Sequence, residues 1–409
     1  MEIDSLTLAL IFLNLLTRDD IEKLPRGIYR DHFHQNPITD PDDCATVSNQ
    51  CLGKSYVYDF AKNWLGNGIL TADVETWKIH RKLLSPAFSQ KTVESFMGVF
   101  NEQAKCLSSK LVAEFNGKKN DQNGLHISGT AFGVDPEKHR TLIDNYLKAL
   151  DEIKDILQER FRKPWLHSEV VYKWTFLKSK ETAVCSENFK PFMDSLLELG
   201  DNDQLYNDKE IRDETNTIIF GGHDTSSVAL IFILILIGSY PDVQDKVYSE
   251  LIRILGNKDD VNRKNVSKLV YLEAVIKETL RLYPIGFLVA RHAEEEVKLK
   301  NYTLPAGSNC FLNFWGLHHH AIWGPDAEVF RPERWLDSTL PENPNAFGAF
   351  HIGKRSCIGR VYAIISMKTT LAHLLRHYRI RADVTKLVVK LETFLKPASG
   401  HYIAIERRI

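Results

Sequence analysis

The stretch FGAFHIGKRSCIG, residues 347–359, decides the fold of this 409-residue chain. It sets one cysteine, Cys357, among glycines and basic residues, with a polar loop before it and a helical pattern after it. A thiolate on a tight turn at the start of a helix is stabilised by backbone N–H groups and by the helix dipole. Cys357 is therefore a candidate nucleophile or metal ligand. The alternative is a buried, inert thiol, which is the commoner role of a single cysteine.

The composition is that of an ordinary globular protein. Lys and Arg number 52 and Asp and Glu 53, a net charge of −1, which gives no electrostatic reason to expect nucleic acid. The six cysteines form no C-x-x-C pair and no zinc-like spacing, so we expect reduced thiols in a cytosol-facing protein. The length allows a core large enough to enclose a cofactor.

One apolar run, residues 6–16, is shorter than the about 20 apolar residues that a bilayer-spanning helix needs. It also lacks the basic start and the cleavage site of a signal peptide. We expect residues 1–37 to be an N-terminal segment, a partial leader or helix without a complete membrane anchor. Residues 38–409 are expected to form one catalytic domain.

A long helix is predicted over residues 208–237, and its second half is almost wholly apolar, so it must be buried on all sides. Gly221, Gly222, His223, Asp224 and Thr225 interrupt this pattern. Two glycines inside a helix cost about 1 kcal/mol each relative to alanine, and a buried acid costs more unless it is paired. The sequence favours a functional interpretation, in which the glycines admit a ligand and the polar side chains hold water or pass protons.

Three weaker patterns each have an ordinary explanation. Trp77 and Arg81 share one face of a predicted helix, which alone indicates a solvated basic helix with a core tryptophan. Glu278 and Arg281 are i,i+3 neighbours, which alone indicates an exposed ion pair worth about 0.2–0.5 kcal/mol. Residues 318–320 are three consecutive histidines, but consecutive side chains diverge, so a metal site is not expected there.

The remaining pattern predicts a mainly helical chain with short strands. The expected elements are a helix start at residues 39–41, helices over 141–162 and 361–377, a helix opened by Pro241, short strands within 286–315, a loop over 117–140, and a terminal hairpin of 387–389 with 402–405 around Ser399 and Gly400.

Read together, these pieces resemble the cytochrome P450 family, whose fold is mainly α with small β-sheets. The matching motifs, in the family's order, are Trp77-x-x-x-Arg81, Gly222-His-Asp-Thr-Ser226, Glu278-x-x-Arg281, Arg331-Pro-Glu-Arg-Trp335 and Phe350-x-x-Gly353-x-Arg355-x-Cys357-x-Gly359. Finer runs, among them WLGNGIL at 64–70 and WKIHRK at 77–82, are similar to family 4 of that superfamily, an animal and insect microsomal type.

The resemblance implies a role for each matching residue. Cys357 is expected to be the axial thiolate ligand of a haem iron, and Asp224 and Thr225 to deliver protons during oxygen activation. Glu278, Arg281 and Arg334 are expected to form a buried structural network. The other residues that the resemblance places at the haem are Trp77, Arg81, Arg291, Arg355, Phe350, Gly353, Gly359 and Gly222.

The implied activity is that of a haem-thiolate monooxygenase: R–H, O2, two electrons and two protons give R–OH and water. The implied substrate is hydrophobic, a fatty acid or lipophilic xenobiotic, and electrons come from NADPH through a reductase, with cytochrome b5 as a second donor. The expected location is the cytosolic face of the endoplasmic reticulum membrane, with peripheral membrane contact. A basic face is the expected docking surface for an acidic redox partner; its residues are Lys78, Lys82, Lys354 and Arg360.

One departure from the family concerns the haem. Many family 4 members carry a glutamate, able to bond covalently to the haem, where this chain has Gly221, so we expect non-covalent haem b. Two alternatives stay open. One is a haem-thiolate isomerase or peroxide-using enzyme, which the retained Asp224-Thr225 pair disfavours. The other is a haem-binding but catalytically impaired or incomplete copy, consistent with the short N-terminus and the contracted region at about 117–185.

Overall fold

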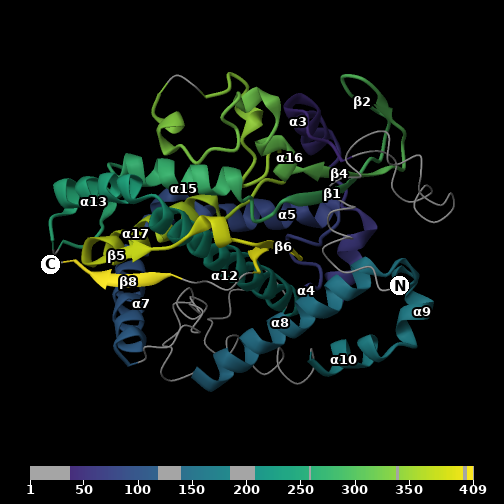
Figure 1. Ribbon diagram of the computed structural model, residues 1–409. Helices are drawn as coiled ribbons and strands as arrows, with labels where there is room; N and C mark the ends of the chain where they lie inside the picture. Colours follow the sequence, from purple (N-terminus) through teal and green to yellow (C-terminus); the bar gives the residue numbers. More distant parts are fainter. Residues whose placement is uncertain are drawn as a thin grey trace.

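The computed structural model describes residues 37–117, 140–184, 208–257, 259–337, 340–398 and 403–408, and helices make up most of it (Figure 1). The helices are α3 (Pro41–Gln50), α4 (Lys62–Leu65), α5 (Val74–Leu84), α6 (Gln90–Ser95), α7 (Met97–Gly117), α8 (Arg140–Arg162), α9 (Glu169–Lys173), α10 (Phe176–Val184), α12 (Asp208–Ser239), α13 (Pro241–Leu255), α14 (Arg263–Val266), α15 (Val270–Leu282), α16 (Phe314–His318) and α17 (Arg360–His377). The apolar run at 6–16 and Cys185 lie outside the described residues, as does the predicted loop over 117–140 except for its two end residues, which belong to α7 and α8.

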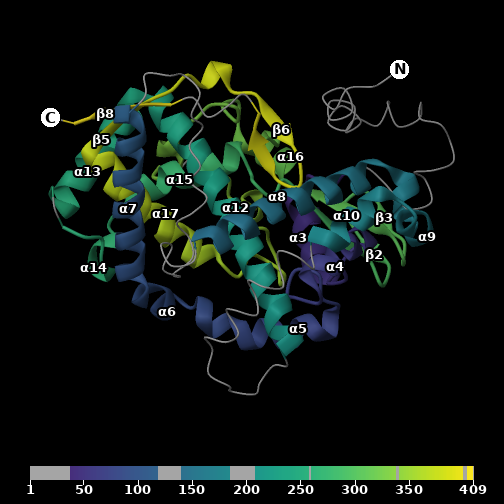
Figure 2. The same ribbon diagram turned by 90° about the horizontal axis from the view of Figure 1, so that it is seen from below.

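Helix α12 lies at the centre of the molecule, with α7, α13 and α17 to one side and α3, α4, α9 and α10 to the other (Figure 2). It contains the predicted helix over 208–237 and continues to Ser239. Phe232, Ile233 and Ile237 are fully buried. In the described part of the chain α12 is the one helix long and apolar enough to cross a membrane, but most of its apolar window is buried by neighbouring elements, as in the core helix of a globular domain.

The local signals at helix ends explain where several helices begin and stop. The Asp40 carboxylate accepts the N–H groups of Asp42 and Asp43 at the start of α3. Pro241 occupies the first turn of α13, and Gly256, with a φ of +59°, ends that helix. The predicted boundaries at these positions are confirmed.

Four two-stranded antiparallel sheets are present among the described residues. The strands are β1 (Leu288–His292), β2 (Val297–Lys298), β3 (Thr303–Leu304), β4 (Asn309–Asn313), β5 (Tyr378–Arg381), β6 (Val389–Leu391), β7 (Leu395–Pro397) and β8 (Ala404–Arg407). Strand β1 pairs with β4 in the register Leu288 to Asn313, which confirms the strands predicted within 286–315.

The predicted terminal hairpin is wrong. Strand β6 begins in the predicted strand 387–389 but pairs with β7, which was not predicted, and β8 pairs with β5 at the end of α17. Ser399 and Gly400 lie outside the described residues. The apolar pattern located the C-terminal strands but not their partners, because period-two alternation carries no information about which strand lies opposite.

The pair Glu278–Arg281 is fully buried, so the exposed-ion-pair explanation is wrong and the structural network implied by the resemblance is present. Glu278 Oε1 lies 2.9 Å from Arg281 Nη2 and 2.9 Å from Arg334 Nε, and all three side chains are inaccessible. Arg334 lies in the 3₁₀ turn η7 (Pro332–Trp335), and Arg281 also donates to the carbonyl of Ala327 at 2.6 Å. The network joins α15 to the loop that leads to the cysteine.

Candidate functional site

The cysteine loop closes on itself through backbone hydrogen bonds. The Cys357 N–H donates to the Phe350 carbonyl at 2.8 Å, and the Ser356 N–H donates to the Gly353 carbonyl at 3.1 Å. Gly353 has a φ of +75°, and a Cβ there would lie 2.6 Å from the carbonyl oxygen of Ser48 on α3. Glycine is therefore needed at position 353 for two reasons: the left-handed backbone and the close approach of α3.

Gly359 has a different role from Gly353. Its φ is −83°, and in the described part of the chain the nearest atom to an added Cβ, apart from its chain neighbours and the local helix backbone, is the Cys357 Sγ at 3.9 Å, so the turn does not require glycine there. Gly359 is the N-cap of α17, and its N–H faces the sulfur of Cys357. The loop thus places the sulfur at a helix N-terminus, as predicted.

The Cys357 side chain is accessible to solvent, yet protein atoms surround it closely. Burial raises the pKa of the Cys357 thiol, while the Gly359 N–H and the cations Arg81 and Arg360 oppose that change. A raised pKa does not suit an unassisted nucleophile, whereas a bound metal deprotonates a thiol that coordinates it.

Helix α5 contacts the cysteine loop through two side chains, Arg81 and Trp77. Arg81 Nη1 donates to the Ser356 carbonyl at 2.8 Å, and the Arg355 guanidinium lies 4.6 Å from the centre of the Trp77 ring. The structure therefore brings Trp77, Arg81, Arg355 and Cys357 together, although they come from two segments far apart in the sequence.

Sequence reasoning missed the contact that anchors α5 on its other side. His80 Nδ1 lies 2.6 Å from Glu214 Oε1 on α12, and both side chains are buried. Burial raises the pKa of Glu214. His80 belongs to the WKIHRK run, but the run gives no indication of a partner 134 residues later.

Two buried arginines carry donors that no group in the described residues accepts. Arg291 on β1 is 1% exposed, and its Nε has no acceptor. Arg355 Nη2 donates to the Ala72 carbonyl at 3.1 Å, but its Nε and Nη1 have no acceptor. Burial and the nearby Arg291 lower the pKa of Arg355 to about 10. Buried guanidinium donors without partners are costly, and their geometry matches a carboxylate.

Helix α12 presents an open face at its glycines. Outside the helix's own backbone, an added Cβ at Gly221 or Gly222 would meet no atom of the described residues within 4 Å, although the next turns of the helix are buried. The Thr225 hydroxyl donates to the Gly221 carbonyl at 2.5 Å on this accessible face. The interruption predicted from sequence is thus a stretch of regular helix whose backbone is left open to a ligand.

The Asp224 carboxylate faces two lysines, Lys154 and Lys396, and not the Thr225 hydroxyl. Its Oδ1 lies 2.9 Å from Lys154 Nζ on α8, and its Oδ2 lies 3.7 Å from Lys396 Nζ on β7. Burial lowers the pKa of Lys154, and the carboxylates of Asp224 and Asp151 raise it by more. Neither lysine was predicted as a partner of Asp224, because the sequence pattern around each one predicts only a helix or a strand.

His318, the first residue of the histidine run, connects helix α15 to the cysteine loop through hydrogen bonds. His318 Nδ1 lies 2.9 Å from the Arg281 carbonyl, and the Gly348 N–H donates to its Nε2 at 2.9 Å. Since Nε2 accepts, Nδ1 carries the proton, and complete burial lowers the pKa of His318 to about 3. Among the residues that the structure describes, no cluster of three or more His, Cys, Asp or Glu side chains is placed to hold a metal ion.

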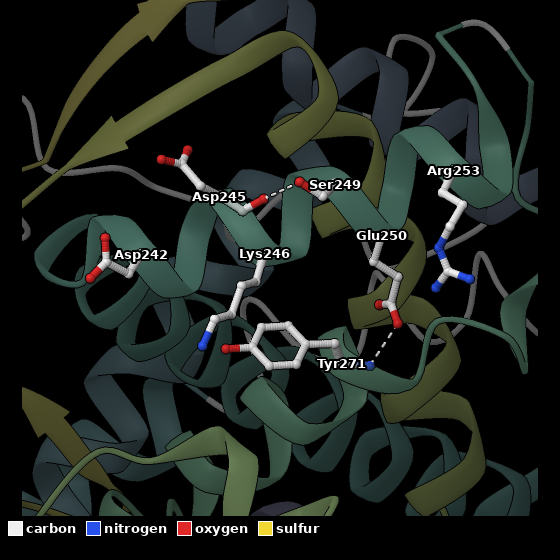
Figure 3. Close-up of a pocket in the computed structure, with 7 residues that line it drawn as sticks. All are labelled: Asp242, Asp245, Lys246, Ser249, Glu250, Arg253 and Tyr271. Atoms are coloured by element: carbon white, nitrogen blue, oxygen red, sulfur yellow. Dashed lines mark hydrogen bonds between the residues drawn. The ribbon is translucent and has the colours of Figure 1, made fainter.

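A separate surface pocket lies between α13 and the start of α15 (Figure 3). It is lined by Asp242, Asp245, Lys246, Ser249, Glu250, Arg253 and Tyr271. Its Glu250 carboxylate accepts the N–H groups of Val270, Tyr271 and Leu272, so it caps α15. Because its lining carries charges of both signs and its Glu250 caps α15, this pocket serves to connect α13 with α15. We assign it no catalytic or binding role.

The residues around Cys357 fit one class of ligand. An accessible soft sulfur donor, an open helix face and two buried guanidinium groups with free donors match a flat, iron-carrying group with carboxylate substituents. Haem has all of these properties.

Comparisons with known proteins agree with this fit. The family model for cytochrome P450 matches residues 51–199 and 134–405. Cytochrome P450 4c21 of Blattella germanica is 30% identical over 407 residues, which cover 88% of this chain and 81% of that protein. Cytochrome P450 4V2 of Homo sapiens is 30% identical over 88% of this chain and 78% of its own length. Cytochrome P450 4c3 of Drosophila melanogaster is 30% identical over 88% of this chain and 77% of its own length.

Proposed function

The chain belongs to the cytochrome P450 family and is a P450 monooxygenase, and from this premise we propose that it inserts one oxygen atom from O2 into a fatty acid-like or lipophilic substrate. The observation that carries the proposal is the accessible Cys357 sulfur beside the unpartnered donors of Arg291 and Arg355. A hydrophobic substrate is supported by the similarity to family 4, whose members include fatty-acid ω-hydroxylases.

We propose that Cys357 would ligate the haem iron through its thiolate and that Trp77, Arg81, Arg291 and Arg355 would bind or position the haem carboxylates. When bound through a cysteine thiolate, haem supplies the oxygen-activating chemistry, because the thiolate favours O–O bond cleavage. The protein's part is to hold the sulfur on the loop closed between Phe350 and Cys357 and to neutralise the carboxylates.

Proton supply is assigned to α12. The Thr225 hydroxyl lies on the open face of the helix, and we propose that it passes protons to the reacting oxygen. Asp224 is the proposed source behind it, paired with Lys154. To reach Thr225 the Asp224 carboxylate must turn away from Lys154. Substitution Thr225→Ala is expected to divert electrons into hydrogen peroxide while the haem content stays unchanged; equal coupling of NADPH oxidation to product in both proteins would contradict the assignment.

The haem is proposed to be non-covalent haem b, because Gly221 supplies no carboxylate at the open face of α12. Acidified organic solvent should extract all of the haem from wild-type protein. Haem that stays with the polypeptide after extraction would contradict this.

We propose that electrons come from NADPH through a reductase, with cytochrome b5 as a second donor, docked on the basic face predicted from the sequence. Lys78, Lys82, Lys354 and Arg360 are all exposed, and Ile79 on the same helix is 60% exposed. The apolar centre and charged surroundings are the arrangement expected of a transient docking site.

We further propose peripheral contact with the cytosolic face of the endoplasmic reticulum membrane. Trp165 and Trp174 are 62% and 89% exposed, and Val170 and Val171 lie exposed between them. Tryptophan favours the bilayer interface, and the flanking Lys163 and Lys173 would be attracted to anionic lipids. A W165S/W174S variant should float less with anionic vesicles than wild type; equal flotation would contradict this contact.

The direct test of the function is product formation with purified protein, reductase and NADPH. Hydroxylated fatty acid or another lipophilic product is expected, and none should form without NADPH. Bound haem with correct ligation and no product from any lipophilic substrate would instead support the impaired-copy alternative.

A further inference from the structure

One residue of the cysteine loop has a backbone conformation that its side chain disfavours. His351 has a φ of +58°, and in the part of the chain that the structure describes it is the one residue other than glycine with a positive φ. A Cβ makes the left-handed region costly, so such a conformation persists only where the surrounding structure enforces it, and it is found most often at functional sites. At His351 the imidazole ring makes the enforcing contacts.

The imidazole ring connects the cysteine loop to two other segments. His351 Nε2 lies 3.2 Å from the carbonyl oxygen of Gly286, just before β1, and the ring centre lies 4.8 Å from that of Phe314, the first residue of α16. A carbonyl oxygen only accepts, so Nε2 carries the proton and donates to Gly286. A Cβ at position 286 would lie 2.9 Å from Nε2, so any residue other than glycine there would push the ring away. Burial, followed by the field of Arg291, lowers the pKa of His351 to about 3, which keeps the ring neutral near pH 7.

The peptide group between Phe350 and His351 transmits these contacts to the cysteine. Its N–H donates to the Gly348 carbonyl at 2.8 Å, and its C=O accepts the Cys357 N–H at 2.8 Å. Rotation about the N–Cα bond of His351, which φ measures, turns this peptide group relative to the His351 side chain. A ring bound to Gly286 and a φ of +58° therefore fix the direction in which the Phe350 carbonyl points. If His351 relaxed to an ordinary negative φ with its ring in place, that carbonyl would turn away from Cys357.

We propose that His351 is a positioning residue for the Cys357 thiolate: by donating from Nε2 to the Gly286 carbonyl, it holds the loop in its left-handed turn and keeps the sulfur at the start of α17. The proposal rests on the proposed thiolate ligation of haem. It extends that function to a position that the F-x-x-G-x-R-x-C-x-G pattern leaves unspecified. His351 acts through the Phe350 carbonyl and the Cys357 N–H, as hydrogen-bonded supports of metal ligands do.

The test compares variants of the ring. His351→Ala removes the donor and keeps the backbone strain, whereas His351→Gly removes the donor and folds without strain, because glycine adopts a positive φ freely. His351→Gln is the conservative variant, since its side-chain amide carries an N–H donor about as far from the backbone as Nε2. His377→Ala is the matched control, because His377 is an exposed histidine at the end of α17.

Amide hydrogen exchange of the purified protein, resolved to single residues by mass spectrometry, tests the hydrogen bond to Gly286. The Cys357 amide should exchange about 10-fold faster in His351→Ala than in wild type, the effect of one lost hydrogen bond, and several-fold faster in His351→Gly. The acceleration should be confined to residues 348–359, because a positioning role leaves the rest of the fold intact. In His351→Gln and His377→Ala the exchange rate should stay within about 2-fold of wild type.

A second measurement follows the sulfur. The reduced, carbon monoxide-bound holoprotein is kept in dilute guanidinium, and the loss of the Soret band typical of thiolate ligation is timed. His351→Ala should lose this band about 10-fold faster than wild type, and His351→Gln should restore the wild-type rate. A side chain that acts by packing alone would speed thiolate loss only as much as it speeds unfolding of the whole chain. Global unfolding in the same solution, measured by circular dichroism, should therefore change less than thiolate loss.

The outcomes that overturn the proposal are distinct from failure of the proposed function. Equal exchange of the Cys357 amide in His351→Ala and His377→Ala, or exchange as fast in His351→Gln as in His351→Ala, overturns the role of the Nε2 donor. Faster exchange without faster loss of the thiolate band overturns its effect on the sulfur. Each of these results leaves the proposed function in place, whereas a wild-type protein that never shows the thiolate band overturns that function and this assignment together.

Discussion

Gly353 meets two structural demands that can be measured separately. Its φ is +75°, and a Cβ would lie 2.6 Å from the backbone oxygen of Ser48. Gly353→Ala should lower the free energy of unfolding by more than about 2 kcal/mol, from the left-handed strain and the clash together. Gly307 is the control, because its φ is +82° but, apart from its chain neighbours, no atom of the described residues lies within 4 Å of an added Cβ. Gly307→Ala should cost only about 1 kcal/mol in urea unfolding; equal costs would contradict the close approach of α3.

His318 makes stability depend on pH. Its pKa is about 3 in the folded protein, through burial, against about 6.5 in the unfolded chain. The unfolded chain therefore binds the proton first, and stability is lost as pH falls below about 6.5, by up to about 1.4 kcal/mol per pH unit. His318→Gln should be less stable at pH 7, but the difference from wild type should shrink toward pH 4.5. His320→Gln, at a partly buried helix cap, is the control; parallel pH profiles for His318→Gln and wild type would contradict the assignment.

At the scale of the elements, a buried ion pair between Lys154 and Asp224 connects helix α8 to helix α12. Lys154 and Asp224 are 8% and 10% exposed. Lys154→Met should lower the free energy of unfolding by about 2–3 kcal/mol, less than the loss of an isolated buried pair because Lys396 still faces Asp224.

The double variant Lys154→Met/Asp224→Asn tests whether this loss comes from an unpaired carboxylate. It should recover part of the stability, since the remaining amide no longer needs a counter-charge. Lys148→Met, an exposed position on the same helix, should change unfolding by less than about 0.5 kcal/mol. No recovery in the double variant would show that Lys154 acts by packing alone.

The elements differ in how far sequence predicts them. Helices α8, α12 and α17 were predicted because their apolar periodicity extends over many residues, and α3 and α13 because their caps are local signals. The pairing of β8 with β5 was not predicted, because which strands pair depends on the arrangement of the whole fold. At the site, Cys357, Trp77, Arg81 and Arg355 belong to motifs. Lys154 and Glu214 do not, and only their contacts across the chain identify them.

At the scale of the whole molecule, the basic face should determine how fast electrons arrive. Lys82→Glu/Lys354→Glu should lower the rate of reductase-dependent turnover at low salt, because opposite charges steer association. Increasing the salt concentration should reduce the difference from wild type. Lys386→Glu, an exposed lysine on another element, is the control. Turnover unchanged at low salt in the double variant would rule out docking at this face.

The central claim is that Cys357 ligates a haem iron as a thiolate. The most direct measurement is the absorption spectrum of the purified, reduced protein with carbon monoxide. Wild type should show the Soret band at the position typical of thiolate ligation, and Cys357→His should lose it, because an imidazole replaces the thiolate. Wild-type protein without haem, or with an imidazole-like band, would contradict the account.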